Sequence, residues 1–369
     1  MPLIIISGGG TGGHIYPAIG IAKELVQLDP TVEVLFIGAK DRLESTIVPE
    51  HGFRFLPIWV AGFPRKLTWA WVPVIGKACS GFVRALWLIK KWQPEVVVGT
   101  GGYVCGPVLF AAVLLGIPTV IQEQNASPGL TNRILARWAK AIYLAFEMAA
   151  LHFPTDTAKV IGNPIRQTIG AGERNHQVYQ KFGLDPDLKT VFVMGGSQGA
   201  HAINQTVMDA VGDLESFHQQ FQIIHQTGPV DYKAVKSRYS ISALRHVVQP
   251  YFDPIEEVYR IADLMVCRAG GMTISEITAC GIPAIFIPLP TATGDHQRLN
   301  AQAVADKGGG IVLDGRSLDG GELASEIVKI ITDPEKHRRL ANASRELGNP
   351  CAGEEIAKSI YSIVMRKMQ

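Results

Sequence analysis

The feature that most constrains the fold is a repeated pattern in which a short apolar run leads directly into a glycine-rich segment. Residues 3–7, 190–195 and 264–267 show it most clearly, because each run is rich in Ile, Val or Met and glycines follow within three residues. Continuous apolar runs of this length are typical of strands that are buried on both faces of a parallel sheet. The pattern therefore predicts units of strand, glycine loop and helix.

This alternation of strand and helix occurs twice along the chain. The strands expected in the first half lie at residues 3–7, 32–37, 95–99, 118–122, 141–145 and 159–162, and those in the second half at 190–195, 221–226, 246–249, 264–267 and 284–288. Pro164 and its polar neighbours break the pattern between the halves. We therefore predict an α/β protein of two Rossmann-like, doubly wound parallel-sheet domains. Ligands are expected at the carboxyl ends of the strands, in a cleft that the two domains face.

Composition excludes several functional classes. A net charge of +2 without a dense basic tract argues against a nucleic-acid partner. The five cysteines form no CxxC pair and lie far apart, which favours free thiols in a reducing cytosol over a zinc site or disulfides. The D-x-D at Asp185–Asp187 precedes a strand and is interpreted as a turn, so we predict no metal site. With no signal segment and no apolar run of about 18 residues, we expect a soluble or peripheral protein.

The first glycine segment, Ser7–His14, matches the spacing G-x-G-x-x-G. We predict that a helix follows it from about Pro17 to Leu28. Dinucleotide-binding folds use this spacing to bring the backbone close to a pyrophosphate. A nicotinamide or flavin enzyme would also need an acid at the end of the second strand, and Asp41 comes too late for that position. This disfavours an oxidoreductase. Two interpretations of His14 stay open: a satisfied capping or core histidine, and a catalytic residue at a helix start.

The second glycine segment, Gly195–Ala200, follows the first strand of the second half. Its amides and the Ser197 hydroxyl could hold a diphosphate at a helix start. It lacks the lysine of a P-loop, which excludes a nucleoside-triphosphatase motif. The alternative is a tight turn that binds nothing.

The third glycine segment, Arg268–Glu276, has the strongest polar character. We predict Thr273–Glu276 as the first turn of a helix, where unpaired N–H groups favour an anionic or hydroxyl-rich ligand. The Glu276 carboxylate has the reach to accept both hydroxyls of a ribose. The loop that follows offers three side chains suited to sugar hydroxyls: His296, Gln297 and Asn300. The alternative is an ordinary helix start followed by a polar loop.

Residues 62–92 contain many aromatic and basic side chains and no acid. The large apolar side chains include Phe63, Trp69, Trp71, Val72, Ile75, Phe82 and Trp87. Basic residues interleaved with aromatic ones suit an anionic phospholipid surface. A core helix flanked by solvated lysines is the alternative.

Several motifs occur in order along nearly the whole chain. They are GGGTGGHIYPA, GTGGYVCGP, EQNASPG, GNPIR, GGSQGA and RAGGMTISE followed by DHQRLNA. In this set the chain resembles the MurG family, the UDP-N-acetylglucosamine:lipid I N-acetylglucosaminyltransferases of peptidoglycan synthesis. The resemblance implies a GT-B fold and an inverting transfer of GlcNAc from UDP-GlcNAc to the MurNAc 4-hydroxyl of lipid I, giving lipid II. A related transferase with another lipid acceptor, and a UDP-sugar-binding module without catalysis, are the alternatives.

The resemblance also implies an organisation of the chain. Residues 1–163 would form the acceptor and membrane-side domain, 164–349 the UDP-GlcNAc-binding domain, and 350–369 a helix that packs back on the first. The segment 62–92 would dock on the cytoplasmic face of the bacterial inner membrane, where lipid I lies. No cofactor is obligatory, because helix starts can stabilise the UDP leaving group without a metal. The Mg²⁺ dependence and the oligomeric state stay open.

The family's site residues carry over onto matching positions. His14 would be the general base on the acceptor hydroxyl. Glu276 would hold the ribose hydroxyls and Gln297 the GlcNAc hydroxyls, while Phe252 falls where the family packs backbone on uracil. The other donor-site positions are Thr11, Gly12, Gly13, Asn125, Arg166, Ser197, Gly271, Met272, Thr273, Ile274 and Ser275. The chain departs from the family pattern at Cys105, where a small residue such as serine is expected, and at Gly271, where alanine is usual.

Overall fold

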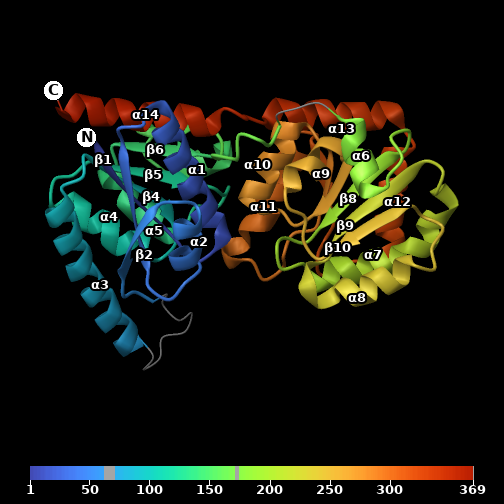
Figure 1. Cartoon of the computed structure of the whole chain (residues 1–369), viewed down its shortest axis with the longest axis horizontal. Helices are drawn as coiled ribbons and strands as arrows, with labels where there is room; N and C mark the ends of the chain where they lie inside the picture. Colours follow the sequence, from blue (N-terminus) through green and yellow to red (C-terminus); the bar gives the residue numbers. More distant parts are fainter. Residues whose placement is uncertain (62–70, 171–173, 369) are drawn as a thin grey trace. The chain divides into compact units, whose positions relative to one another are not determined.

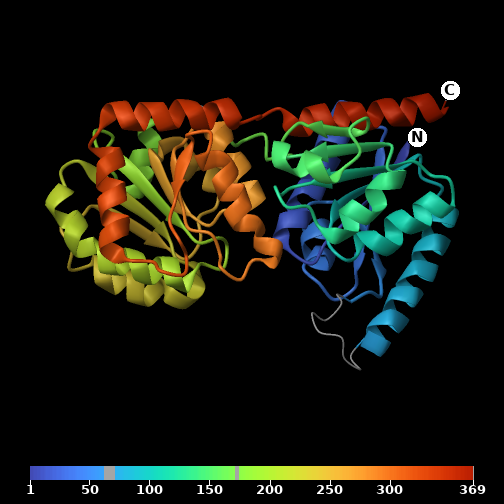
Figure 2. The ribbon, with the colours of Figure 1, turned by 180° about the vertical axis from the view of Figure 1, so that it is seen from behind.

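A computed structural model describes residues 1–61, 71–170 and 174–368 of the chain. The chain divides into two compact units. The first contains Met1–Arg166 together with the chain from Cys351 onward, and the second contains Gln167–Pro350. Figures 1 and 2 show that each unit is a sheet covered by helices on both faces.

In the described part of the first unit, seven parallel strands form one sheet in the order β3-β2-β1-β4-β5-β6-β7. The strands are β1 Leu3–Gly8, β2 Glu33–Ala39, β3 Arg54–Ile58, β4 Val96–Gly101, β5 Thr119–Glu123, β6 Ala141–Leu144 and β7 Ala158–Val160. The helices are α1 Gly12–Leu28, α2 Glu44–Glu50, α3 Trp71–Trp92, α4 Cys105–Leu114, α5 Leu130–Leu135, η1 Ala136–Trp138, η2 Glu147–His152 and α14 Ala352–Met368.

Strand β1 shows why the apolar runs are continuous. Ile4 and Ile6 belong to a core with α1 and α14, whereas Leu3 and Ile5 belong to a core with α3 and α4. Successive side chains of a strand point to opposite faces, so a strand with helices on both sides must be apolar throughout.

The described part of the second unit repeats this plan with six parallel strands in the order β10-β9-β8-β11-β12-β13. The strands are β8 Lys189–Met194, β9 Phe221–Gln226, β10 His246–Gln249, β11 Leu264–Cys267, β12 Ala284–Phe286 and β13 Gly310–Val312. The helices are α6 His176–Phe182, α7 His201–Leu214, η3 Glu215–Phe217, α8 Gly228–Tyr239, α9 Ile255–Ile261, α10 Gly271–Cys280, η4 Thr293–Asp295, α11 His296–Ala305, α12 Gly320–Ile331 and α13 Pro334–Leu347. The prediction of two doubly wound parallel sheets is confirmed.

The last helix, α14, returns to the first unit and packs beside α1 (Figure 1). Ile356 and Ile360 are fully buried in the same core as Ile4 and Ile6. The Tyr361 hydroxyl donates to Asp29 Oδ2 over 2.8 Å at the end of α1. The first unit therefore needs residues from both ends of the chain to complete its core.

Two strands were missed from the sequence, β3 and β13, and both are edge strands. Strand β3 includes Pro57 and is mostly half-buried or exposed, and β13 is three residues long after a run of glycines. Short edge strands carry a weak apolar pattern, which explains the omission. Among the described residues, every helix is too short or too polar to cross a lipid bilayer.

Candidate functional site

The strand order of the first unit creates a switch point between β1 and β4, where the chain leaves neighbouring strands in opposite directions. Such sheets bind ligands just outside the carboxyl ends of the strands at this point. The glycine loop after β1 and the segment Gly101–Val104 after β4 both lie there. Two of the motifs are therefore brought together by topology.

Helix α1 begins at Gly12, five residues earlier than the start at Pro17 that the sequence suggested. Thr11 is the extended N-cap residue, and Pro17 lies inside the helix. The N–H groups of Gly12 and Gly13 have no partner among the described residues, so they can bind an anion. His14 consequently belongs to the first turn of the helix and not to the loop.

His14 is held at both its backbone and its ring. The Thr100 hydroxyl donates to the His14 carbonyl oxygen over 2.8 Å. Imidazole Nδ1 lies 3.1 Å from the Thr100 carbonyl oxygen and 2.9 Å from Gln124 Oε1. Gly101 has φ +104°, and a Cβ at that position would lie 2.8 Å from Nδ1. Gly101, the second glycine of the GTGG motif, therefore leaves room for the His14 ring.

A carboxylate that sequence analysis missed supports the first glycine loop from below. Glu44 is fully buried and accepts from the N–H groups of Gly10 and Ala39, each over 3.1 Å. A Cβ on Gly9 would lie 2.2 Å from its Oε1. The acid that follows β2 thus bonds to backbone amides. Its position five residues beyond the strand was the available signal.

Cys105 begins α4 and ties the ends of β1 and β4 together. Its thiol donates to the carbonyl oxygens of Ser7, over 2.7 Å, and Gly101, over 2.9 Å. Burial raises the pKa of this thiol to about 12, so the thiol stays protonated and donates. Cys105 therefore performs the bridging role that a serine hydroxyl could perform.

The EQN motif places Asn125 beside a buried acid. Glu123 accepts from the Asn125 backbone N–H over 3.1 Å, from Gly129 N–H over 3.1 Å and from Asn132 Nδ2 over 2.8 Å. Glu123 therefore orders the loop that carries Asn125. Arg166 is exposed and ends the first of the two segments that form the first unit.

The second unit has its own switch point, between β8 and β11. The Gly195–Ala200 loop follows β8, and Ser197 is exposed at its tip. Gly199 has φ +77°, and a Cβ there would come within 2.0 Å of the Thr227 carbonyl oxygen, so the position requires glycine.

Gln226, at the end of β9, connects this loop to the predicted uracil site. Its Nε2 donates to the Gly196 carbonyl oxygen over 3.2 Å, and its Oε1 accepts from the Phe252 N–H over 3.0 Å. The Phe252 ring is buried edge-on against Phe182 and Phe192, so only the backbone of this residue can meet a ligand.

Helix α10 begins at Gly271, so the prediction that Thr273–Glu276 forms the first turn was wrong. Gly270 adopts the extended N-cap conformation, which moves the start two residues earlier than expected. The N–H groups of Gly271, Met272 and Thr273 have no partner among the described residues. Free N–H groups at a helix start favour an anionic ligand. Two further residues of the motif differ in exposure: Ser275 is half-buried and the Ile274 side chain is in the core.

Glu276 lies in the second turn of α10 and is half-buried. The Tyr259 hydroxyl donates to its Oε2 over 3.0 Å. Burial and the adjacent Glu276 raise the pKa of Tyr259 well above its usual value, so the hydroxyl remains a donor at all working pH values. Tyr259 thereby fixes the orientation of the carboxylate.

Two residues of the DHQRLN segment differ in their exposure: Gln297 is accessible to a ligand and Asn300 is not. Gln297 Oε1 accepts from the Leu289 N–H over 2.9 Å and is half-buried. Asn300 is fully buried, and its Nδ2 donates to the Ala269 carbonyl oxygen over 3.1 Å. The expectation that Asn300 meets sugar hydroxyls was therefore wrong. It braces the loop that precedes α10.

The structure describes only some residues of the predicted membrane face. Phe63 and Trp69 lie outside the described residues, and Trp71, Val72 and Ile75 belong to the start of α3. On the same helix Trp87 is exposed and Phe82 is half-buried. Leu88 and Ile89 are buried in the core. Helix α3 therefore combines a core face and an exposed aromatic face.

The structure extends this aromatic face beyond the predicted segment. The rings of Phe82, Phe110 and Trp138 form a row with centroid separations of 5.6 and 6.2 Å. Phe110 is 40% exposed and Trp138 is 46% exposed. Helices α3, α4 and α5 also expose Val83, Leu114, Leu130 and Ile134. We define the aromatic face as these residues with Trp87. Sequence analysis did not assign α4, α5 and η1 to this face, because their apolar residues resemble ordinary core positions.

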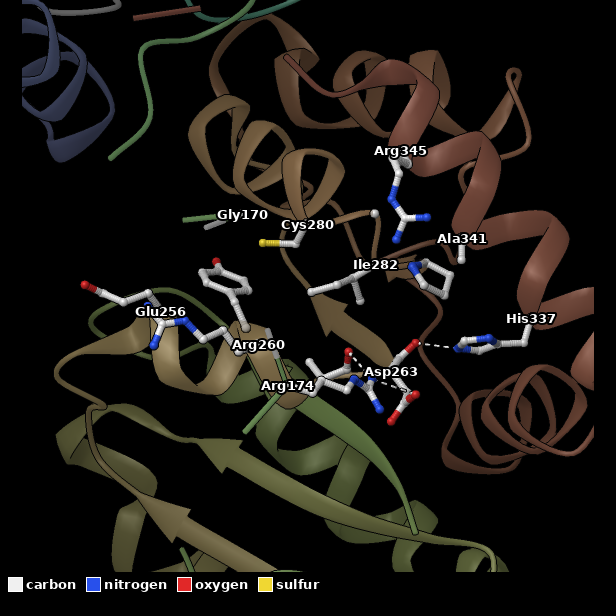
Figure 3. A pocket seen from close by; sticks show the side chains of 14 residues that line it. Gly170, Arg174, Glu256, Arg260, Asp263, Cys280, Ile282, His337, Ala341 and Arg345 are labelled. Carbon is white, nitrogen blue, oxygen red and sulfur yellow. Dashed lines mark hydrogen bonds and ion pairs between the residues drawn. The ribbon is translucent and has the colours of Figure 1, made fainter. Parts of the chain in front are cut away.

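A cavity of about 280 Å³ lies elsewhere in the second unit (Figure 3). Asp263 is one of its lining residues; its carboxylate pairs with Arg174 at 2.8 Å and its carbonyl oxygen accepts from His337 Nε2 at 2.8 Å. Asp263 and Pro283 directly precede β11 and β12, so the cavity lies at the amino ends of these strands. None of the predicted donor residues lines it. Ligands bind such sheets at the opposite ends, so we assign the cavity no part in the reaction.

Two family models match the chain. The glycosyltransferase family 28 N-terminal domain matches residues 4–144, and the family 28 C-terminal domain matches residues 190–359. A curated UDP-N-acetylglucosamine–N-acetylmuramyl-(pentapeptide) pyrophosphoryl-undecaprenol N-acetylglucosamine transferase from Halalkalibacterium halodurans is 40% identical over 355 residues, covering 96% of this chain and 97% of that protein. The transferase of the same name from Bacillus pumilus is 39% identical over 363 residues, covering 98% of each.

Solved structures agree with these matches. The crystal structure of MurG from Acinetobacter baumannii has a TM-score of 0.80 and 28% identity, covering 98% of this chain and 100% of that one. The UDP-GlcNAc 2-epimerase from Neisseria meningitidis has a TM-score of 0.69 at 14% identity, covering 98% of this chain and 100% of that one, and shares the fold alone. The GT-B fold class is thereby confirmed. The chain belongs to glycosyltransferase family 28 and, within it, to the MurG transferases.

Proposed function

We propose that this chain transfers N-acetylglucosamine from UDP-GlcNAc to lipid I and so produces lipid II for peptidoglycan. The observation that carries the proposal is the 40% identity, over 96% of this chain, with a transferase whose name states that donor and that acceptor. The structure supports it with a set of unpaired helix-start amides at the switch point of each unit, as a diphosphate requires.

In this proposal the second unit binds most of the donor. The amides at the start of α10 and the loop that carries Ser197 hold the diphosphate, because helix starts and glycine loops favour anions. Glu276 accepts the ribose hydroxyls, Gln297 contacts the GlcNAc hydroxyls, and the Phe252 backbone packs on uracil. The first unit adds contacts from Thr11, Gly12, Gly13, Asn125 and Arg166.

The reaction we propose is a single inverting displacement. The 4-hydroxyl oxygen of MurNAc attacks the anomeric carbon from the face opposite to UDP, and the bond from that carbon to the β-phosphate oxygen breaks. His14 takes the hydroxyl proton, and the electron pair leaves with UDP. Amides already oriented at helix starts stabilise the negative charge that grows on the diphosphate.

The proposal is tested by transfer of radiolabel from UDP-GlcNAc to a short-chain lipid I analogue, with and without a chelator. We expect a labelled disaccharide lipid in both conditions. A diacylglycerol acceptor serves as the comparison. Label on diacylglycerol but not on lipid I would support the alternative lipid-acceptor transferase, and donor binding without transfer to either lipid would support a binding module.

Replacing Glu276 with alanine should raise the KM for UDP-GlcNAc about 10- to 100-fold, because hydrogen bonds to a charged group each contribute about 1.5–3 kcal/mol. Glu276→Gln keeps an acceptor for the Tyr259 hydroxyl and should have a smaller effect. Glu346→Ala, an exposed acid of the same unit, is the matched control. An unchanged donor KM in Glu276→Ala, measured by steady-state transfer, would remove Glu276 from the ribose site.

We also propose that the aromatic face docks on the cytoplasmic leaflet of the inner membrane. Arg84 lies 4.3 Å from the Trp87 ring centroid and Arg137 lies 5.2 Å from that of Trp138, so cations accompany the exposed rings. Residues 124–146, like 62–92, contain no acid. Aromatic side chains with nearby cations suit an anionic lipid surface.

The double change Phe110→Ser and Trp138→Ser should weaken binding to vesicles that contain anionic lipid by roughly tenfold or more, since each exposed ring loses about 1 kcal/mol or more of apolar burial. Binding of the unchanged protein should also fall at high salt. Ile241→Ser, an exposed apolar residue of the second unit, is the control for sedimentation with vesicles. Equal binding by the double variant and the control would exclude this face.

A further inference from the structure

Three buried amide side chains form a hydrogen-bonded row that ends at the His14 ring, and the proposed reaction gives them no role. Gln122 and Gln124 belong to β5 and its end, and Asn163 follows β7. Each is at most 2% exposed. Gln122 Nε2 donates to Asn163 Oδ1 over 2.8 Å, Gln124 Nε2 donates to Gln122 Oε1, and Gln124 Oε1 lies 2.9 Å from His14 Nδ1.

Backbone carbonyl groups fix the direction of Asn163 and Gln124, because a carbonyl oxygen can only accept, and these two amides orient Gln122 between them. Asn163 Nδ2 donates to the Gln124 carbonyl oxygen over 3.2 Å, so its Oδ1 must face Gln122. Gln124 Nε2 donates to the Thr100 carbonyl oxygen over 2.6 Å, so its Oε1 must face His14. Burial leaves no water to satisfy a reversed amide, which makes the reversed arrangement costly.

The direction of the row determines the tautomer of His14. Nδ1 faces two acceptors, Gln124 Oε1 and the Thr100 carbonyl oxygen, so Nδ1 must carry the proton. In the neutral ring Nε2 then has the free lone pair that a general base requires. The opposite tautomer would place a lone pair against two oxygens.

We propose that Gln124 is a positioning residue that holds the imidazole of His14 in the Nδ1-protonated tautomer, with Gln122 and Asn163 fixing the orientation of Gln124. The assignment rests on the proposed function for its catalytic consequence. The tautomer itself is a property of the protein without substrate. The chain thus uses a neutral amide where a base is often oriented by a carboxylate.

The first experiment measures the tautomer directly. Long-range ¹H–¹⁵N correlation spectra of histidine-labelled protein distinguish a protonated Nδ1 from a protonated Nε2, and comparison with His14→Ala identifies the His14 signals. We expect Nδ1 to be protonated in the unchanged protein. In Gln124→Leu, which leaves one of the two acceptors at Nδ1, we expect a larger share of the Nε2-protonated tautomer. A protonated Nε2 in the unchanged protein overturns the proposal whether or not transfer is observed.

The second experiment is a double-mutant cycle in the transfer assay. Gln124→Leu should lower kcat about tenfold with little change in the donor KM, because a base that is held less firmly is less often in position. In the His14→Ala background the same change should alter kcat by less than about twofold, since Gln124 acts through His14. An additive loss in that background overturns the proposal.

Two further variants keep the test decisive if Gln124→Leu folds poorly. Gln122→Met removes the side-chain acceptor of Gln124 Nε2 and leaves its bonds to the Thr100 and Gln122 carbonyl oxygens, so we expect a smaller loss of kcat in the same direction. Thr119→Val is the control on the same strand, because among the described residues the Thr119 hydroxyl bonds only to the Trp138 carbonyl oxygen. Equal effects of Gln122→Met and Thr119→Val would show a merely structural role.

Discussion

Replacing His14 with alanine should lower kcat by about 10²- to 10⁴-fold and leave the KM for UDP-GlcNAc nearly unchanged. The imidazole is fixed by Thr100 and Gln124 through Nδ1, which directs the basic Nε2 away from the strand ends. Loss of a positioned base removes an interaction that exists only while the acceptor proton moves. The donor diphosphate depends on backbone amides, and the variant keeps them.

Steady-state transfer with separate titrations of donor and acceptor measures this effect. His152→Ala, an exposed histidine of the same unit, is the matched control and should behave as the unchanged protein. An unchanged kcat in His14→Ala would remove His14 from the mechanism. A large rise in the donor KM with the same kcat would instead assign it to donor binding.

The strands were largely predictable because burial on both faces leaves an unbroken apolar run, as in β1 and β4. Helix starts were less predictable. Pro17 was predicted to begin α1, but in the structure it lies in the second turn of that helix. The two glycines before Met272 are the N-cap and the first residue of α10, which the local pattern did not indicate. Proline and glycine fit several positions around a helix start, so local pattern alone cannot choose among them.

The candidate site was predictable where a motif carries its own chemistry and not where it depends on distant partners. Glycine loops followed by helices indicated anion sites. Three of the groups that orient the site residues are Glu44, Gln124 and Gln226, and each acts on residues about 25 to 110 positions away in the sequence. Such amides and acids in or near strands look like ordinary polar residues until the fold brings them to a switch point.

The second large effect concerns the stability of the second unit as the pH falls. His225 in β9 is fully buried, with Nε2 3.0 Å from Asn204 Oδ1 and Nδ1 3.4 Å from the Tyr239 hydroxyl. Burial lowers its pKa from 6.5 to about 3. Three other titratable groups lie near these partners. Asp231 accepts from Asn204 and pairs with His201, and His246 stacks on Tyr239.

Between the two pKa values the unfolded chain binds a proton at residue 225 that the folded chain does not bind. The free energy of unfolding therefore falls as the pH drops below about 6.5, by up to about 1.4 kcal/mol per pH unit from this one group. Above pH ~7 both states are neutral there and the effect vanishes. Lowering the pH from about 7 to about 5 should thus reduce the free energy of unfolding by about 2 kcal/mol through His225, and the variant His225→Gln should not show this loss.

The distribution of tryptophan provides an internal control for this measurement. All six tryptophans of the sequence fall within Met1–Arg166, the first segment of the first unit: Trp59, Trp69, Trp71, Trp87, Trp92 and Trp138. Tryptophan fluorescence in urea therefore follows the first unit, whose pH dependence should be the same with and without His225→Gln. Hydrogen exchange of peptides from β8 and β9 follows the second unit, where the variant should show the shallower pH dependence. Equal pH dependence of both proteins in those peptides would mean that His225 is protonated in the folded state, and the buried neutral imidazole would have to be abandoned.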